Sequence, residues 1–191
     1  MIRRNIRPAI LVFVILTIIT GVLYPLIITG IAQICFNKQA NGSLILKDDK
    51  TVGSTLIGQS FTDPKYFWGR PSATSPIPYN ASSSSGSNLG PSNSVLTDTT
   101  KTRIETFRLV DPDNQKLIPI DLVTCSASGL DPHISIAGAY YQIPRVARAR
   151  GLSQGTIRAI VDKHTYGRFL GIIGEPVVNV LEVNLELDSS R

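Results

Sequence analysis

The chain has 191 residues, 42% of them hydrophobic, and a formal net charge of +5. Its only cysteines are Cys35 and Cys125, which make neither a cysteine-based metal set nor a disulfide framework. Residues 37–191 hold 16 Lys and Arg against 14 Asp and Glu, so the positive excess comes mainly from arginines near the N-terminus. This distribution argues against a nucleic-acid-binding domain, which would concentrate basic residues on its folded part.

An uncharged apolar run over residues 8–36 predicts one transmembrane helix. At about 1.5 Å per residue, a helix of this length is more than enough to cross a hydrocarbon core of roughly 30 Å. A cleaved signal peptide is the alternative, with residues 30–32 as a small-x-small cleavage site. The apolar part of a signal peptide is normally only about 7–15 residues, so the sequence favours the membrane span.

Charges on either side of the span predict its orientation. Arg3, Arg4 and Arg7 precede it, and Lys38 alone follows it closely. Because cytoplasmic flanks are enriched in Lys and Arg, we expect a cytoplasmic N-terminus and an outer C-terminal domain. The predicted organisation is therefore a cytoplasmic segment at 1–7, a transmembrane helix at 8–36 and an extracytoplasmic soluble domain at 37–191.

Small and polar residues recur every four positions along the span. They form one stripe that another membrane helix can approach closely, although lone anchors also carry such residues. Within the stripe, a proline removes a backbone donor and predicts a kink near the glycine four residues before it. The residues of this predicted helix-contact stripe are Thr17, Gly21, Pro25, Thr29 and Gln33.

After the span, the patterns predict one mixed α+β domain with short strands, several helices and a long Ser/Gly/Pro-rich loop. Ser92 or Asn93 is the expected cap of the first helix, and Gly151 and Ser153 mark later helix ends. The expected strands cover 43–46, 53–59, 119–125 and 177–187, and the expected helices cover 94–110, 134–143 and 153–163. Pro144 is expected to end the second of these helices or to begin another one through residue 150.

The loop at 63–94 contains aromatic residues as well as serine, glycine and proline. A flexible linker is one interpretation of its serine run. The cluster Tyr66, Phe67 and Trp68 has too much apolar area to remain in water, so we favour an ordered functional loop. Arg145, Arg148, Arg150 and Arg158 are interpreted as a solvated basic face.

Catalytic machinery is sparse in the sequence. Ser128, Asp131 and His133 are the residue types of a hydrolytic triad, but such close spacing seldom gives the geometry that a nucleophile and its base need. His133 and His164 lack the spacing of metal ligands. Residues 126–129, at a predicted helix start, offer backbone N–H groups to an anion, which is a weak signal by itself.

Several blocks of sequence, in order along the chain, resemble the KdpC family, the C subunits of bacterial potassium-transporting Kdp ATPases. The resemblance covers nearly the whole chain behind its single N-terminal span. Cys125 and residues 138–140 depart from the family pattern. The blocks that carry the resemblance are 24–26, 39–43, 56–61, 66–73, 86–93, 121–134, 142–147 and 174–181.

The resemblance implies an accessory subunit that is not itself an ATPase. Its implied partners are a channel-like potassium-translocating subunit, an ATP-hydrolysing P-type subunit and a small fourth subunit, in the bacterial cytoplasmic (inner) membrane. Such chains are described as catalytic chaperones that raise the ATP affinity of the motor subunit. In that description Ser126, Ser128, Gly129 and Gln142 help to hold nucleotide, with no stably bound cofactor and no metal.

An outer domain conflicts with direct contact to cytoplasmic ATP, because the bilayer would separate the two. We therefore expect an indirect effect of the domain on ATP affinity. The loops would then contact other subunits, with Trp68, Arg70, Tyr79, Asn88 and Asn93 as candidate contact residues. The alternatives are an anchored extracytoplasmic hydrolase using Ser128 and His133, and an anchored binding domain that acts without partners.

Overall fold

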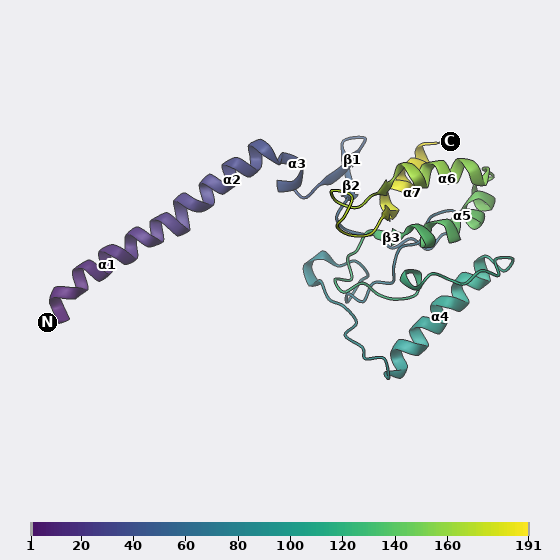
Figure 1. The fold of residues 1–191 in the computed structure, drawn as a ribbon, viewed down its shortest axis with the longest axis horizontal. Helices are drawn as coiled ribbons and strands as arrows, with labels where there is room; N and C mark the ends of the chain where they lie inside the picture. Colours follow the sequence, from purple (N-terminus) through teal and green to yellow (C-terminus); the bar gives the residue numbers. More distant parts are fainter. Residues whose placement is uncertain (1, 191) are drawn as a thin grey trace. The chain divides into compact units, whose positions relative to one another are not determined.

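The computed structural model describes residues 2–190, with side chains from Asn5 onward. Met1, Arg191 and the side chains of Arg3 and Arg4, which the predicted topology uses, lie outside the described part. The described chain divides into two compact units, one ending at Leu44 and one beginning at Ile45. Figure 1 shows the first unit as helix and the second as a mixture of helices and short strands.

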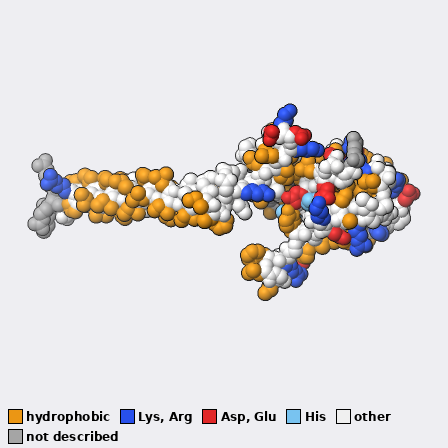
Figure 2. Space-filling view, turned by 90° about the horizontal axis from the view of Figure 1, so that it is seen from above, with side chains coloured by type: hydrophobic (Ala, Val, Ile, Leu, Met, Phe, Trp, Pro, Cys, Tyr) orange, Lys and Arg blue, Asp and Glu red, His pale blue; other side chains and the backbone are white. Residues whose placement is uncertain are grey.

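The first unit is dominated by one long apolar helix. α1 (Ile2–Ile18), a π-helical turn (Ile19–Leu23) and α2 (Tyr24–Cys35) follow one another along it. Within the stretch Asn5–Cys35, an 18-residue window has a mean hydropathy of 2.7 and no buried residue, and Figure 2 shows hydrophobic side chains along the helix. The helix is therefore long and apolar enough to cross a membrane, as the sequence predicts.

The π-helical turn ends at Leu23, two residues before Pro25. Proline lacks the N–H that would bond to the carbonyl of Gly21, and its ring crowds that carbonyl. A wider turn is one way in which a helix accommodates such a defect without ending. Gly21 thus lies in a π-helical turn within a continuing helix, and the kink predicted near it stays a prediction.

The second unit begins with a small two-stranded sheet. After α3 (Asn37–Ala40) of the first unit come β1 (Leu44–Lys47) and β2 (Lys50–Ser54), which pair with each other. The strand expected at 53–59 is wrong, because the chain turns back after Ser54. The side chain of Gln59 then donates to the carbonyl of Val52 at 2.7 Å, which closes the turn.

α4 (Ser94–Val110) has the predicted bounds, and the side chain of Asn93 accepts from the Val95 amide at 2.9 Å as its cap. The strand expected at 119–125 is wrong, since a 3-10 turn, Ile120–Leu122, occupies that place. The reason lies in Asp121, whose carboxylate accepts a hydrogen bond from the Ser135 amide at 2.7 Å. This bond ties the segment to the start of α5 instead of to a neighbouring strand.

A three-stranded antiparallel sheet supports the centre of the domain. Its order is β3 (His133–Ser135), β5 (Val177–Asn179) and β4 (Thr165–Tyr166). The helix expected from residue 134 is therefore wrong at its start. Ser135 caps α5 (Ile136–Arg150), which continues through Pro144 and ends at Gly151 with a φ of +66°.

α6 (Gln154–Lys163) has the predicted place and the predicted Ser153 cap. The strand expected at 177–187 is wrong after Asn179, where α7 (Val180–Ser189) begins. Buried Val180, Val183 and Leu187 follow the i, i+3, i+7 spacing of a helix face. The side chain of Asn179 accepts from the Glu182 amide and so starts the helix directly after the strand.

The core lies between α5 and the elements around it. Figure 1 shows α5, α6 and α7 grouped on one side of the domain, with α4 on the other. Two aromatic residues of the 63–94 loop belong to this core, so that part of the loop is ordered by burial. The large buried side chains are Phe67, Trp68, Phe107, Leu122, Ile134, Tyr141, Val146, Ile157, Val161, Val178, Val183 and Leu187.

The predicted solvated basic face on α5 is wrong for two of its arginines. The buried guanidinium of Arg145 donates to Pro64 O at 2.5 Å and lies 4.5 Å from the ring centre of Trp68. Burial lowers the pKa of Arg145 to about 10, so it remains charged at neutral pH. Arg150 donates to Lys65 O and Leu187 O and pairs with Asp188 at 2.8 Å. Arg145 and Arg150 thus connect residues 64–68 of the loop to α5 and α7.

The carboxylate of Asp188 predicts a dependence of stability on pH. Burial acts to raise its pKa, but hydrogen bonds from Arg150 and Tyr66 outweigh burial and hold the pKa below 3.8. A carboxylate whose pKa is lower in the folded chain stabilises the fold at pH values above its pKa in the unfolded chain. This contribution is lost as the pH falls through the pKa of the folded chain.

We expect the urea midpoint to fall less steeply below pH 5 in Asp188→Asn than in the wild type. Asp113→Asn, on an exposed carboxylate, should keep the wild-type slope, and equal slopes in all three proteins would contradict the assignment.

Candidate functional site

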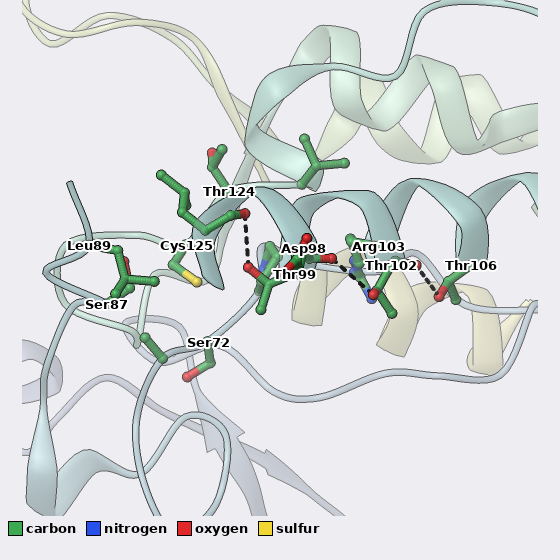
Figure 3. A pocket seen from close by; sticks show the side chains of 14 residues that line it. Ser72, Ser87, Leu89, Asp98, Thr99, Thr102, Arg103, Thr106, Thr124 and Cys125 are labelled. Atoms are coloured by element: carbon green, nitrogen blue, oxygen red, sulfur yellow. Dashed lines mark hydrogen bonds between the residues drawn. The ribbon is translucent and has the colours of Figure 1, made fainter. Parts of the chain in front are cut away.

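A groove of about 510 Å³ runs between α4 and three loops of the second unit. Figure 3 shows Ser72, Leu89 and Cys125 on the loop side and Thr99 and Thr102 on α4. The threonine hydroxyls of this wall bond back to α4, as Thr99 does to Val95 O at 2.8 Å. The residues that line it are Pro71, Ser72, Ala73, Ser87, Leu89, Leu96, Asp98, Thr99, Thr102, Arg103, Thr106, Val123, Thr124 and Cys125.

Three side chains at the groove are ionisable: Arg103, Cys125 and the exposed carboxylate of Asp98. Arg103 donates to Leu122 O at 3.2 Å and to Gly69 O at 3.1 Å, and burial lowers its pKa. Burial raises the pKa of the Cys125 thiol, which keeps it protonated and a weak nucleophile. The groove therefore presents mainly apolar surface, with the carboxylate of Asp98 as its exposed charge, and neither Arg103 nor Cys125 is a reactive group there.

The loop at 126–129 uses its serines for its own turns. Ser126 Oγ accepts from the Gly129 amide at 2.9 Å, and Ser128 Oγ accepts from the Leu130 amide at 3.1 Å. Gly129 has a φ of +67°, a conformation that favours glycine. The helix start expected here is wrong, because α5 begins at Ile136. The helix N-terminus that would attract an anion is thus absent from this loop.

Gln142 is 1% exposed, and its amide is fully engaged inside the domain. Its Oε1 accepts from the Trp68 amide at 2.8 Å and from Arg145 at 2.6 Å. Its Nε2 donates to Trp68 O at 3.0 Å and to Gly138 O at 3.3 Å. These bonds fix the backbone of Trp68 against α5, and none of them goes to residues 126–129.

The residues of the hydrolase alternative do not form a triad. Asp131 lies 3.5 Å from His133 Nδ1 and also pairs with Arg70 at 3.2 Å. Burial acts to raise the pKa of Asp131, but hydrogen bonds from His133 and the charge of Arg70 outweigh it and lower the pKa. The hydroxyl of Ser128 is engaged with Leu130, and within residues 2–190 no hydrogen bond joins Ser128 to His133.

The candidate contact residues of the loop divide into two kinds. Trp68 is 2% exposed and belongs to the core, so its side chain does not present a contact surface. Tyr79 donates to Arg70 O at 2.6 Å, and burial raises its pKa to about 12. Arg70 itself holds Cys125 O at 2.9 Å. Asn88 and the capping residue Asn93 are exposed.

The stripe of the apolar helix is exposed along its length. Thr17 donates to Phe13 O at 2.8 Å, and Gly21 has no neighbour where a Cβ would lie, which leaves this surface open. At its end, Gln33 Oε1 accepts from the side chains of Asn37 at 3.2 Å and Asn41 at 3.1 Å. Pro25 and Thr29 are likewise exposed. The role of this stripe in helix contact stays a prediction.

One surface feature escapes the sequence interpretation. The loop between β4 and β5 exposes Phe169, Leu170, Ile172 and Ile173 side by side in the chain. The available signal was a short apolar run bounded by Gly167 and Gly174, which by sequence alone also fits a buried strand.

Comparison with known proteins gives a match over nearly the whole chain. The family model described as KdpC, K+-transporting ATPase, c chain, matches residues 6–189. The Potassium-transporting ATPase KdpC subunit of Dechloromonas aromatica is 62% identical over 184 residues, 96% of each chain. Those of Sorangium cellulosum and Polaromonas naphthalenivorans are 57% and 59% identical over 98% and 97% of this chain, and over 98% and 95% of their own lengths.

The chain belongs to the KdpC family. The sequence resemblance is thereby confirmed, and it links the chain to potassium transport and to a membrane-associated ATPase complex. Several blocks that carry the KdpC resemblance contain residues with structural tasks, such as Trp68, Asp121 and Gln142. In this chain, these three side chains stabilise the fold.

Proposed function

We propose that this KdpC-family chain is a non-catalytic accessory subunit of the K+-transporting ATPase in the bacterial cytoplasmic membrane. The observation that carries the proposal is the family match across residues 6–189, which includes both the apolar helix and the folded domain. Its partners in the proposal are the channel-like potassium-translocating subunit, the ATP-hydrolysing P-type subunit and the small fourth subunit.

In the proposed topology, residues 1–7 are cytoplasmic, residues 8–36 span the membrane and residues 37–191 fold outside. The apolar stretch Asn5–Cys35 and the arginines before it support this arrangement. The stripe of Thr17, Gly21, Pro25, Thr29 and Gln33 then faces helices of the other subunits.

We propose that the chain affects ATP use indirectly and holds no cofactor of its own. Support comes from Gln142, whose four hydrogen bonds stay within the domain, and from residues 126–129, which form no helix N-terminus. A coupling free energy of about 1–3 kcal/mol between subunits would change ATP affinity by roughly 5–150-fold. Direct nucleotide binding by Ser126, Ser128, Gly129 and Gln142 would instead require these residues to rearrange.

The proposal is tested by purifying the ATPase complex with and without this chain. At low ATP concentration, we expect the rate of K+-stimulated ATP hydrolysis to be about tenfold lower, or more, in the complex without the chain. Addition of the chain should restore the rate. Full activity without the chain would contradict the accessory role. A chain that folds stably and purifies without the other subunits would support the alternative of an anchored binding domain that acts without partners.

The hydrolase alternative is separated by Ser128→Ala. The accessory role predicts that this substitution leaves K+-stimulated ATP hydrolysis unchanged, because the Ser128 hydroxyl bonds to Ser126 and Leu130 within its own loop. The alternative predicts a hydrolytic activity of the isolated chain that Ser128→Ala abolishes. Detection of such an activity would contradict the proposed non-catalytic function.

A further inference from the structure

The hairpin between β4 and β5 ends in a cluster of exposed apolar side chains. Phe169, Leu170, Ile172 and Ile173 are 69%, 78%, 81% and 62% exposed. We call residues 169–173 the apolar tip. Single exposed hydrophobic residues are ordinary, but a contiguous group at the end of a loop marks an interaction site.

The apolar tip is held in one shape by its own backbone. Phe169 N donates to Ile173 O at 2.8 Å, and Ile173 N donates to Phe169 O at 3.0 Å. Below the tip, Arg168 pairs with Glu175 at 2.9 Å. Because the tip is ordered before it meets a partner and these amides are already bonded, its burial would cost little conformational entropy and few hydrogen bonds.

Leu170, in the turn of the apolar tip, is unusual both in its backbone conformation and in its exposure to solvent. Leu170 has a φ of +53° and Gly171 a φ of +77°, and Ile172 N donates to Phe169 O at 3.1 Å. This is the pattern of a type I′ turn, whose first central position strongly favours Asn, Asp or Gly. A bulky leucine there is unfavourable for the backbone and for solvation. Such a conflict, at an exposed position, points to selection for binding instead of stability.

We propose that the apolar tip docks into an apolar, uncharged pocket on another protein subunit of the K+-transporting ATPase. This inference rests on the proposed function, since it requires assembly with other subunits. The charges next to the tip favour an uncharged partner, because Arg168 is paired with Glu175 and leaves no net charge within residues 168–175.

A protein pocket fits these observations better than a lipid surface does. A rigid, shaped tip gains from a complementary pocket, whereas fluid acyl chains do not require a fixed shape. Anionic head groups would find no unpaired cation at the tip, since Arg168 is engaged. The apolar helix Asn5–Cys35 already supplies a membrane anchor, so a second one would add little.

The first test replaces Leu170 by Asn and Ile172 by Ser in the full chain, expressed with the other subunits. Asn suits the left-handed conformation at position 170, so the melting temperature should stay equal or rise. Recovery of the double variant with the complex should fall by roughly tenfold or more. Leu117→Asn, at a 90% exposed leucine outside the tip, is the matched control and should assemble normally. Normal recovery of the double variant would overturn the proposal.

The second test places a photo-crosslinking benzoylphenylalanine at Ile172, with the same probe at Leu117 as the control. Crosslinks from position 172 to one other subunit of the ATPase are expected. Crosslinks to lipid only would overturn the proposal in favour of a membrane contact. If the proposed function itself fails, even the wild-type chain will not purify with the complex. If only the tip inference fails, wild type and double variant will purify equally well.

Discussion

Gln142→Ala should lower the free energy of unfolding by roughly 3–5 kcal/mol, because it removes one partner of a buried charged network. The substitution leaves the Trp68 amide without its acceptor and takes the 2.6 Å partner from the buried guanidinium of Arg145. Urea unfolding of the full chain in detergent measures the effect.

Gln154→Ala is the matched control, at an exposed glutamine in the first turn of α6. It should change stability by no more than about 0.5 kcal/mol. A loss below about 1 kcal/mol for Gln142→Ala, together with a specific loss of ATP affinity, would show that Gln142 serves nucleotide binding instead of the fold.

Trp68→Ala should destabilise the domain by about 3–5 kcal/mol, the range for truncation of a buried aromatic side chain. The indole packs 5.0 Å from the ring of Phe107, lies under Arg145 and donates to Asp63 O at 3.1 Å. Thermal unfolding of the full chain checks this expectation.

Phe169→Ala removes an aromatic ring of the apolar tip, which is largely exposed, and is the control. It should leave the melting temperature nearly unchanged. A Trp68→Ala chain that keeps wild-type stability but fails to assemble would contradict the core role and restore Trp68 as a contact residue.

The sequence predicted elements whose signals are local. The apolar helix, α4 with its Asn93 cap and α6 with its Ser153 cap depend on composition, periodicity and capping residues, all of which can be read without tertiary contacts. The mixed α+β class followed from the same signals.

The incorrect predictions concern segments whose secondary structure is determined by tertiary contacts. Residues 177–187 read as an imperfect strand, but Asn179 caps a helix there and bonds to Thr55 O, more than a hundred residues away in sequence. Likewise, Asp121 lies in a segment with a strand-like sequence, but its carboxylate accepts a hydrogen bond from Ser135 at the N-terminus of α5. Neither partner can be identified from the local pattern.

The candidate site shows the same limit. Gln142 and Trp68 were singled out as nucleotide and contact residues, yet the structure places them together in the core. The apolar tip cannot be recognised in the sequence, because its exposure depends on the hairpin that carries it. A resemblance to a family thus singles out residues such as Gln142 and Trp68, but it does not state whether they stabilise the fold or bind a partner.

The proposed topology is tested most directly by the sidedness of the domain in intact cells. With Cys35 and Cys125 replaced by alanine, a single cysteine is placed at Ser84 or at Asn5, both exposed in the structure. Cells are treated with a membrane-impermeant thiol reagent. We expect labelling at position 84 and none at position 5 until the cells are opened. Labelling at position 5 with protection at position 84 would place the domain in the cytoplasm and contradict the indirect role in ATP use.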